Sequence, residues 1–208
     1  KYNVTKLDDI ELRPADFIKL DIQGGELNAL KGGENTLNSV FGLEIEVEFL
    51  EIYRKQPLFG DICSWLAKKG FEFVDFVSLV RWERNVYNEH GQGFFGDALF
   101  LKSPEKLEIN KMPLKLISSY MAILLIYRRF DMIDTSLKLL NNKQKDSFSL
   151  FASKLKGLKK IDKRTRNINN ISSFICWTPS WIKYCLSEYR QTQQWLVMNF
   201  VQQKYNLV

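Results

Sequence analysis

Apolar residues in the first half of the chain form short runs and strict alternations that predict β-strands. Residues 16–22 (DFIKLDI) have the length and the β-forming content of a strand. In residues 42–50 (GLEIEVEFL), apolar side chains alternate with glutamates, as expected for a strand with one buried face. Residues 71–76 (FEFVDF) and 94–101 (FFGDALFL) predict two further strands.

Between these strands the apolar positions change to helical spacing. Residues 26–38 place leucines near one face, interrupted by two glycines, and residues 59–69 predict a helix that stops at Gly70. Strands that alternate with helices of this length predict βαβ units and a mainly parallel sheet. The last two strands are joined only by a polar loop, residues 78–92, so they should form an antiparallel pair at the sheet edge.

The second half of the chain shows helical spacing throughout. Ser103-Pro104-Glu105 marks the boundary, so we predict an α/β region over residues 1–104 and an all-α region over residues 105–208. The helices are predicted over residues 113–140, 146–155, 168–176 and 180–205. Residues 154–166 form a basic connector between the second and the third of them.

Composition and charge support two units with different surroundings. The 208 residues are 45% apolar and 13% aromatic, which allows a packed core and argues against global disorder. Residues 1–109 hold 13 basic and 19 acidic side chains, a net charge of −6, whereas residues 110–208 hold 17 basic and 5 acidic, a net charge of +12.

The cysteines and the apolar stretches limit where the protein works. Cys63, Cys176 and Cys185 form no CxxC or Cys/His pair, so we expect reduced residues of a cytoplasmic protein without structural zinc. The longest apolar stretch, near residues 121–127, is far shorter than the ~20 residues of a bilayer span, and we expect no transmembrane segment.

The first strand ends on chemistry-bearing residues. Asp21 stands at the carboxyl end of that strand, where parallel sheets bind ligands, and Gly24 and Gly25 allow a tight turn before Glu26 opens a helix. Asp21 and Glu26 are therefore candidates for a general base or for the ligands of a divalent metal. The alternative, slightly favoured by spacing alone, is that Asp21 caps the turn and Glu26 caps the helix.

Three segments carry a resemblance to a known family. Residues 5–10 (TKLDDI), 16–37 (DFIKLDIQGGELNALKGGENTL) and 42–49 (GLEIEVEF) resemble the FkbM-type S-adenosylmethionine-dependent methyltransferases, and the order is preserved over roughly residues 5–101. Gln23 stands where many members have glutamate, and Gly25 where alanine is common. The resemblance implies a partial Rossmann-like methyltransferase sheet, later strands only, whose fourth strand ends at Asp21.

The resemblance also implies S-adenosylmethionine as cofactor. In such enzymes it lies mostly over the first two strands, on a glycine-rich turn that nothing before Asp21 supplies. We therefore expect a fragment that carries the acceptor side of the pocket and binds cofactor weakly or not at all by itself. Asp21, Gln23 and Gly24 are the residues expected to approach the cofactor.

Further candidates follow the later strands. The polar loop would leave the ligand-binding side of the sheet, so Arg81, Trp82 and Arg84 are candidates to shape the acceptor pocket, and His90 is a candidate general base. The alternative is a solvated loop.

Glu48 near the end of its strand is a candidate acceptor ligand. Alternatively, Glu46 and Glu48 lie on a helix-facing or solvated face.

Two functions from different classes remain open. The main expectation is O-methyl transfer to a hydroxyl of a sugar or secondary metabolite, that is, a small-molecule or glycan acceptor. The rival is a non-catalytic assembly module, a methyltransferase remnant joined to a basic helical region that forms homo-oligomers. Specific nucleic-acid binding is not expected, because the tryptophans of the tail are spaced as in a helical core and no binding motif is present.

Overall fold

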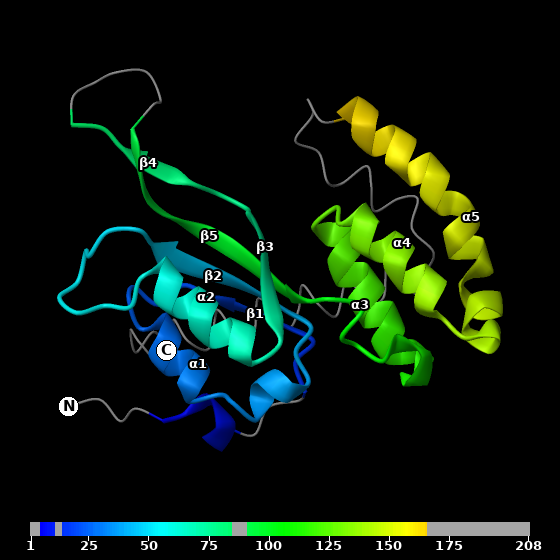
Figure 1. The fold of residues 1–208 in the computed structure, drawn as a ribbon, viewed down its shortest axis with the longest axis horizontal. Helices are drawn as coiled ribbons and strands as arrows, with labels where there is room; N and C mark the ends of the chain where they lie inside the picture. The colour runs from blue at the N-terminus through cyan, green and yellow to red at the C-terminus, as the bar shows by residue number, and fades with distance from the viewer. Residues whose placement is uncertain (1–4, 11–13, 85–90, 166–208) are drawn as a thin grey trace, which may run out of the picture. The chain divides into compact units, whose positions relative to one another are not determined.

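The fold comes from a computed structural model that describes residues 5–10, 14–84 and 91–165. These residues divide into two compact units, one that ends at Ser103 and one that begins at Pro104. Each unit is drawn in Figure 1 and has its own hydrophobic core.

The first unit is built on a mixed five-stranded sheet. Its strands lie in the order β1 (Phe17–Leu20), β2 (Gly42–Glu48), β5 (Gln92–Lys102) and β3 (Phe71–Phe76). A short strand, β4 (Val80–Trp82), pairs with the first residues of β5 (Figure 1). β1 and β2 are parallel, whereas β5 is antiparallel to both β2 and β3. The predicted α/β class is confirmed, with helices following in the second unit.

The sheet differs from the prediction at three points. The predicted mainly parallel pairing is wrong, because among the described strands only β1 and β2 pair in parallel, whereas β5 is antiparallel to β2, β3 and β4. β5 pairs with β3 as expected, but it also lies between β3 and β2, so it is an inner strand. The loop predicted over residues 78–92 is wrong at both ends, because residues 80–82 form β4 and β5 begins at Gln92. The sequence pattern does not predict β4, because this strand is exposed along its whole length and has no buried face to produce an alternation of apolar and polar residues.

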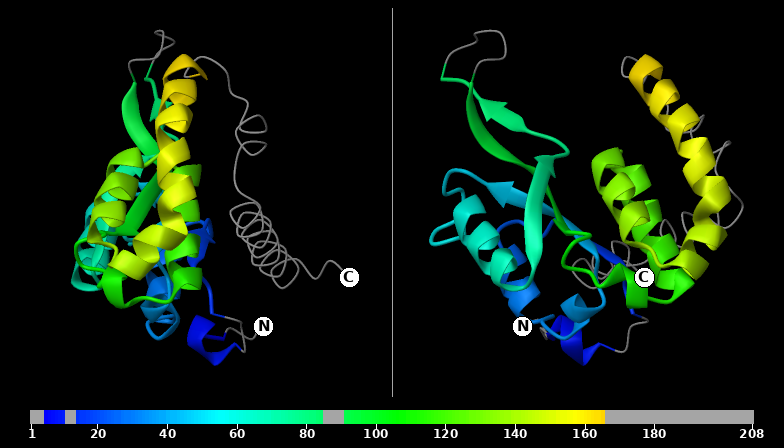
Figure 2. Two further views of the ribbon diagram at one scale, coloured as in Figure 1. Left: turned by 90° about the vertical axis from the view of Figure 1, so that its right-hand side faces the viewer. Right: turned by 45° about the vertical axis from the view of Figure 1, so that its right-hand side comes forward.

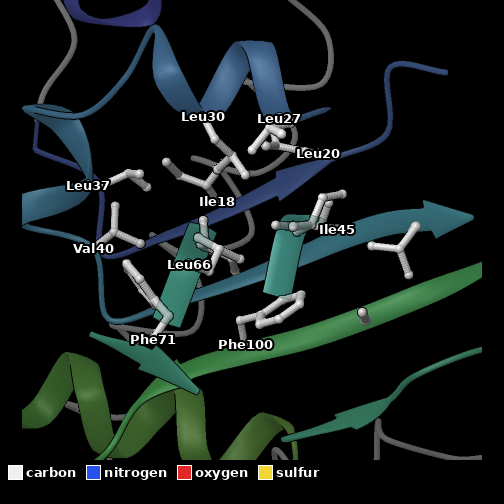
Figure 3. Packing of buried hydrophobic residues seen from close by; sticks show 14 of the residues in the cluster. Ile18, Leu20, Leu27, Leu30, Leu37, Val40, Ile45, Leu66, Phe71 and Phe100 are labelled. Carbon is white, nitrogen blue, oxygen red and sulfur yellow. The ribbon is translucent and has the colours of Figure 1, made fainter. Parts of the chain in front are cut away.

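One face of the sheet is covered by two helices, α1 (Glu26–Lys31) and α2 (Phe59–Lys68). Figure 3 shows their leucines turned toward the apolar side chains of the first two strands, in one buried cluster. The labelled members from these elements are Leu27 and Leu30 of α1, Leu66 of α2, Ile18 and Leu20 of β1, and Ile45 of β2. Gly70 follows α2 with φ +84°, as predicted for a residue that ends a helix.

The helix predicted over residues 26–38 is shorter in the structure. α1 ends at Lys31, and a 3-10 turn, η2 (Thr36–Asn38), follows. Gly32 ends the helix, and Gly33 leaves room for Leu7, because an added Cβ there would lie 2.7 Å from Leu7 Cδ2. The Asp8 carboxylate then accepts hydrogen bonds from Thr36 N at 2.8 Å and Asn35 N at 2.9 Å. This anchors η1 (Leu7–Asp9) to the turn.

The second unit is helical, with α3 (Leu114–Ile126), α4 (Phe130–Leu139) and α5 (Asn142–Thr165), preceded by the turn η3 (Ile109–Lys111). Figure 2 shows α3 and α4 side by side, and α4 contacts α5. The single helix predicted over residues 113–140 is broken at Arg128, which has φ +56°.

The predicted helix over residues 146–155 extends in both directions and absorbs much of the basic connector. It begins earlier than expected because Asn141 and Gln144 exchange side-chain hydrogen bonds with each other's backbone N–H. The helices predicted over residues 168–176 and 180–205 lie outside the described residues. No helix in the described part of the chain combines the length and the apolar character needed to cross a membrane.

Candidate functional site

Two carboxylates meet where β1 ends beside β2. The parallel register sets Leu20 opposite Ile45, so Asp21 follows β1 beside Glu46. Glu46 alternates with Ile45 and Val47, which point into the helix-covered core. Its carboxylate therefore lies on the other face of the sheet, close to the carboxyl end of β2.

Gln23 connects the turn after β1 to this pair. Its Nε2 donates hydrogen bonds to Glu46 Oε2 at 2.9 Å and to Asp21 Oδ1 at 3.3 Å. Its Oε1 accepts a hydrogen bond from the Tyr53 hydroxyl at 3.1 Å. Gln23 has φ +61°, an uncommon backbone conformation for a residue with a side chain. The turn is therefore held by specific contacts that aim the amide at both carboxylates.

Gly24 allows the loop after β2 to close on this turn. It has φ +92°, and an added Cβ would lie 3.1 Å from Tyr53 Cδ2 and 3.6 Å from Gln56 Cβ. Gln56 Oε1 accepts hydrogen bonds from the backbone N–H of Ile52 and of Tyr53. The loop thus keeps its own shape while its side chains pack on the glycine.

Glu26 stabilises the turn between β1 and α1 through a side-chain hydrogen bond. It is the first residue of α1, its side chain is 2% exposed, and its Oε1 accepts a hydrogen bond from Ile22 N at 2.9 Å. This contact differs from the helix cap considered as the alternative for Glu26, because the N-cap of α1 is Gly25 and no side chain caps it. The described residues contain no group of three His, Cys, Asp or Glu side chains arranged to hold a metal ion.

Glu48 is a buried carboxylate at the end of β2. It is 2% exposed, and its Oε2 has no hydrogen-bond partner among the described residues. The neighbouring Gln56 is also buried, and its Nε2 likewise has no partner there. Unsatisfied buried polar atoms are rare in folded proteins and call for a specific explanation.

The environment raises the pKa of both β2 carboxylates. Burial, then the Asp21 charge and a hydrogen bond to Asp21, raise the pKa of Glu46 to about 7. Burial, then the charge of Glu26, raise the pKa of Glu48 to about 7. A carboxylate that titrates near neutral pH is suited to accept a proton from a reacting group.

A cavity opens beside Glu48 and the start of α2. Its volume is about 550 Å³, and it is a shallow depression that is widely open to solvent. The lining residues are Glu48, Phe49, Leu58, Phe59, Gly60, Asp61 and Ser64.

The predicted loop residues lie on or just after β4. β4 and β2 pair with the same part of β5, because Val80 and Glu48 are both opposite Phe95. Arg81 and Trp82 are exposed on β4; Arg81 Nη1 donates to Gly91 O at 2.9 Å, and the Arg84 guanidinium lies 5.0 Å from the Trp82 ring centroid. Among the described residues, no hydrogen bond or ion pair joins Arg81 or Arg84 to Asp21, Glu26, Glu46 or Glu48. His90 lies outside the described residues.

Three residues of the site were not among the candidate site residues predicted from the sequence: Glu46, Tyr53 and Gln56. Glu46 carried a usable signal, because parallel pairing of the two predicted strands sets it beside Asp21. Tyr53 and Gln56 carried none, because they belong to an irregular loop whose path depends on Gly24.

Comparison with known proteins yields one match. Residues 2–73 match the family model described as the methyltransferase FkbM domain, which confirms the resemblance over that stretch. No curated protein and no solved structure shows a significant match to the chain.

Proposed function

We propose that this chain carries the acceptor side of a methyltransferase domain that moves a methyl group from S-adenosylmethionine to a hydroxyl of a sugar or secondary metabolite. The observation that carries the proposal is the match of residues 2–73 to the methyltransferase FkbM domain. The Asp21–Glu46 pair, at the strand ends where such sheets bind ligands, supports it.

The described residues fit only part of the cofactor. The turn at Asp21, Gln23 and Gly24 offers a close backbone approach and carboxylates at its rim. No described strand pairs with the other edge of β1, and residues 1–16 contain no glycine. The chain as described does not enclose S-adenosylmethionine, and the proposal therefore assigns roles to acceptor-side residues only.

On the acceptor side, the task of the chain is to position a hydroxyl and to receive its proton. Asp21 is exposed and can contact an acceptor, and Glu46, whose pKa is raised to about 7, is hydrogen-bonded beside it. The Gln23 amide donates to both carboxylates and so keeps them aimed at the same point. Alignment and proton transfer are each large contributions to the rate of such a reaction.

Calorimetric titration of S-adenosylmethionine and a radiolabelled methyl-transfer assay test the proposal. Both are run on this chain and on a version extended ahead of Lys1 by about a hundred residues, the size of a half-domain. We expect tight cofactor binding and transfer only in the extended version. There, Asp21→Asn should lower kcat by about a hundredfold or more with cofactor affinity little changed, while Asp9→Asn, at an exposed carboxylate, leaves both intact.

One observation favours a second candidate, a non-catalytic assembly module. β1 is the last strand on its side of the described sheet, and an edge strand can pair with another chain. If neither version binds S-adenosylmethionine, the catalytic proposal is wrong, and sedimentation of the chain then tests self-association.

A further inference from the structure

The aromatic ring of Tyr53 is held in place and yet remains exposed. Its hydroxyl donates a hydrogen bond to Gln23 Oε1 at 3.1 Å, and its Cδ2 lies so close to Gly24 that an added Cβ there would be 3.1 Å away. Tyr53 is nevertheless 46% exposed, and the neighbouring Ile52 is 43% exposed. The two side chains form an apolar surface beside the site, and such a surface next to polar groups is typical of ligand sites.

The loop that carries Tyr53 is fixed by its own hydrogen bonds. Gln56 Oε1 accepts from the backbone N–H of Ile52 and of Tyr53, and Gln56 N donates to Tyr53 O at 3.1 Å. Lys55 N donates to the Glu51 carboxylate in the same loop. The orientation of the ring is therefore set before a ligand arrives, which lowers the entropic cost of binding.

The polar groups beside the ring offer acceptors to a ligand. The Gln23 amide is committed, because its Nε2 donates to Asp21 and Glu46 and its Oε1 accepts from Tyr53. Asp21 is exposed, and a carboxylate accepts several hydrogen bonds. A ligand that fits both the ring and the carboxylate therefore needs hydroxyl donors at its rim and a flat apolar face.

A pyranose sugar meets both requirements. When its hydroxyls are equatorial, they point outward, and both faces of the ring present C–H groups. These hydrogens carry a slight positive charge, which suits the negative face of an aromatic ring. A phenol has a flat face but one hydroxyl donor, and glycerol has hydroxyls but no ring face.

We propose that Tyr53 is a specificity-determining residue of the acceptor site: its ring stacks on the C–H face of a sugar ring and so places a sugar hydroxyl at Asp21. The inference rests on the proposed function, since it selects the sugar among the acceptors of the same site and names the residue that recognises it.

Protein-observed NMR titration of the full chain with methyl β-D-glucopyranoside tests the proposal. We expect saturable shifts at the amides of residues 21–24 and 52–56, and much weaker binding of phenol and of glycerol. Tyr53→Leu, which removes the flat ring, should weaken glucoside binding by about fivefold or more. Tyr53→Phe keeps the ring and loses only the hydroxyl, so it should retain most of the affinity.

Phe73→Leu is the matched control, because Phe73 on β3 is exposed to a similar extent, 41%, and should not affect glucoside binding. Tyr53 is half-exposed, so Tyr53→Leu should fold, and unchanged shifts of the β3 amides confirm that it does. Four results each overturn the inference: no saturable shifts with the glucoside, phenol binding as tight as glucoside binding, equal losses for Tyr53→Phe and Tyr53→Leu, or an equal loss for Phe73→Leu.

The transfer assay on the extended protein separates this inference from the proposed function. There, Tyr53→Leu should raise KM for the glucoside by about fivefold or more with kcat little changed, because the ring contacts the acceptor equally in the ground state and in the transition state. An extended protein that methylates phenols and leaves sugars unchanged keeps the function and loses the inference. Glucoside binding through Tyr53 without any methyl transfer keeps the binding site and loses the function.

Discussion

Gly24 holds a backbone conformation that side chains resist, with Tyr53 packed against it. We expect Gly24→Ala to destabilise the first unit by about 1–2 kcal/mol, because φ +92° disfavours a Cβ and the Tyr53 ring leaves little room. Gly25 is the matched control, because its φ is −98° and an added Cβ would lie 3.3 Å from Ile22 Cδ1, at the end of a side chain that can shift, and 3.8 Å from Ile22 O. Urea unfolding of both variants measures the difference, and equal losses would contradict this account.

Lys19 acts at the scale of the elements, because it links three strands on the polar face of the sheet. Its Nζ, on β1, forms ion pairs with Glu44 of β2 and, at 3.2 Å, with Asp97 of β5. Burial alone would lower the pKa of Lys19, and the two carboxylates more than offset it. The charge of Lys19 is thus retained in a half-buried position.

We expect Lys19→Met to cost about 1–3 kcal/mol of unfolding free energy, because it removes the ion pair that Lys19 forms with the largely buried Glu44. Lys69→Met removes the more exposed pair with Glu34 and should cost less than about 1 kcal/mol. Hydrogen exchange of the β2 amides reports the loss in the sheet itself. A larger effect for Lys69→Met would show that exposure does not set the value of these pairs.

At the scale of the whole molecule, stability should depend on pH in an unusual direction. Glu46 and Glu48 have pKa values of about 7 in the folded protein, above the ordinary value of 4.5 to which unfolding returns them. The folded state therefore holds more protons than the unfolded state between these values, so the free energy of unfolding falls as pH rises through that window. We expect a loss on the order of 1–3 kcal/mol, several degrees in Tm, between about pH 5 and about pH 8.

Thermal unfolding of the Glu46→Gln/Glu48→Gln double variant provides the comparison. Without these two titrating groups, its Tm should change much less over the same pH range. A wild-type Tm that is flat or rises with pH would mean that the two carboxylates are not raised in the folded state.

The sequence predicted the elements better than their arrangement. Apolar alternation identified β2, and the short apolar run before Asp21 identified β1, because in both cases burial leaves a pattern along the chain. The placement of β5 between β2 and β3 depends on contacts between distant residues, such as Gly42 with Leu101, that no local pattern records. The break between α3 and α4 depends on one left-handed residue, Arg128, whose type gives no signal for it.

For the site, too, the sequence predicted single residues better than the contacts between them. Asp21 could be placed at a strand end because strand ends are visible in the sequence. The partnership of Asp21 with Glu46 required the register between two strands, and the roles of Tyr53 and Gln56 required the path of a loop. The hydrogen bond from Ile22 N to Glu26 joins the turn to the helix that follows it, and no local pattern in the sequence records it.

The inner position of β5 also governs the order in which the sheet can assemble on the ribosome. β2 emerges early with β1 as its neighbour, yet its other edge pairs with a strand made only after α2, β3 and β4. β3 is in the same position, since β5 is its sheet partner as well. β5, the last strand of the unit, therefore pairs with two strands that are synthesised before it. Translation must pass Lys102 before β2 and β3 can both pair with β5.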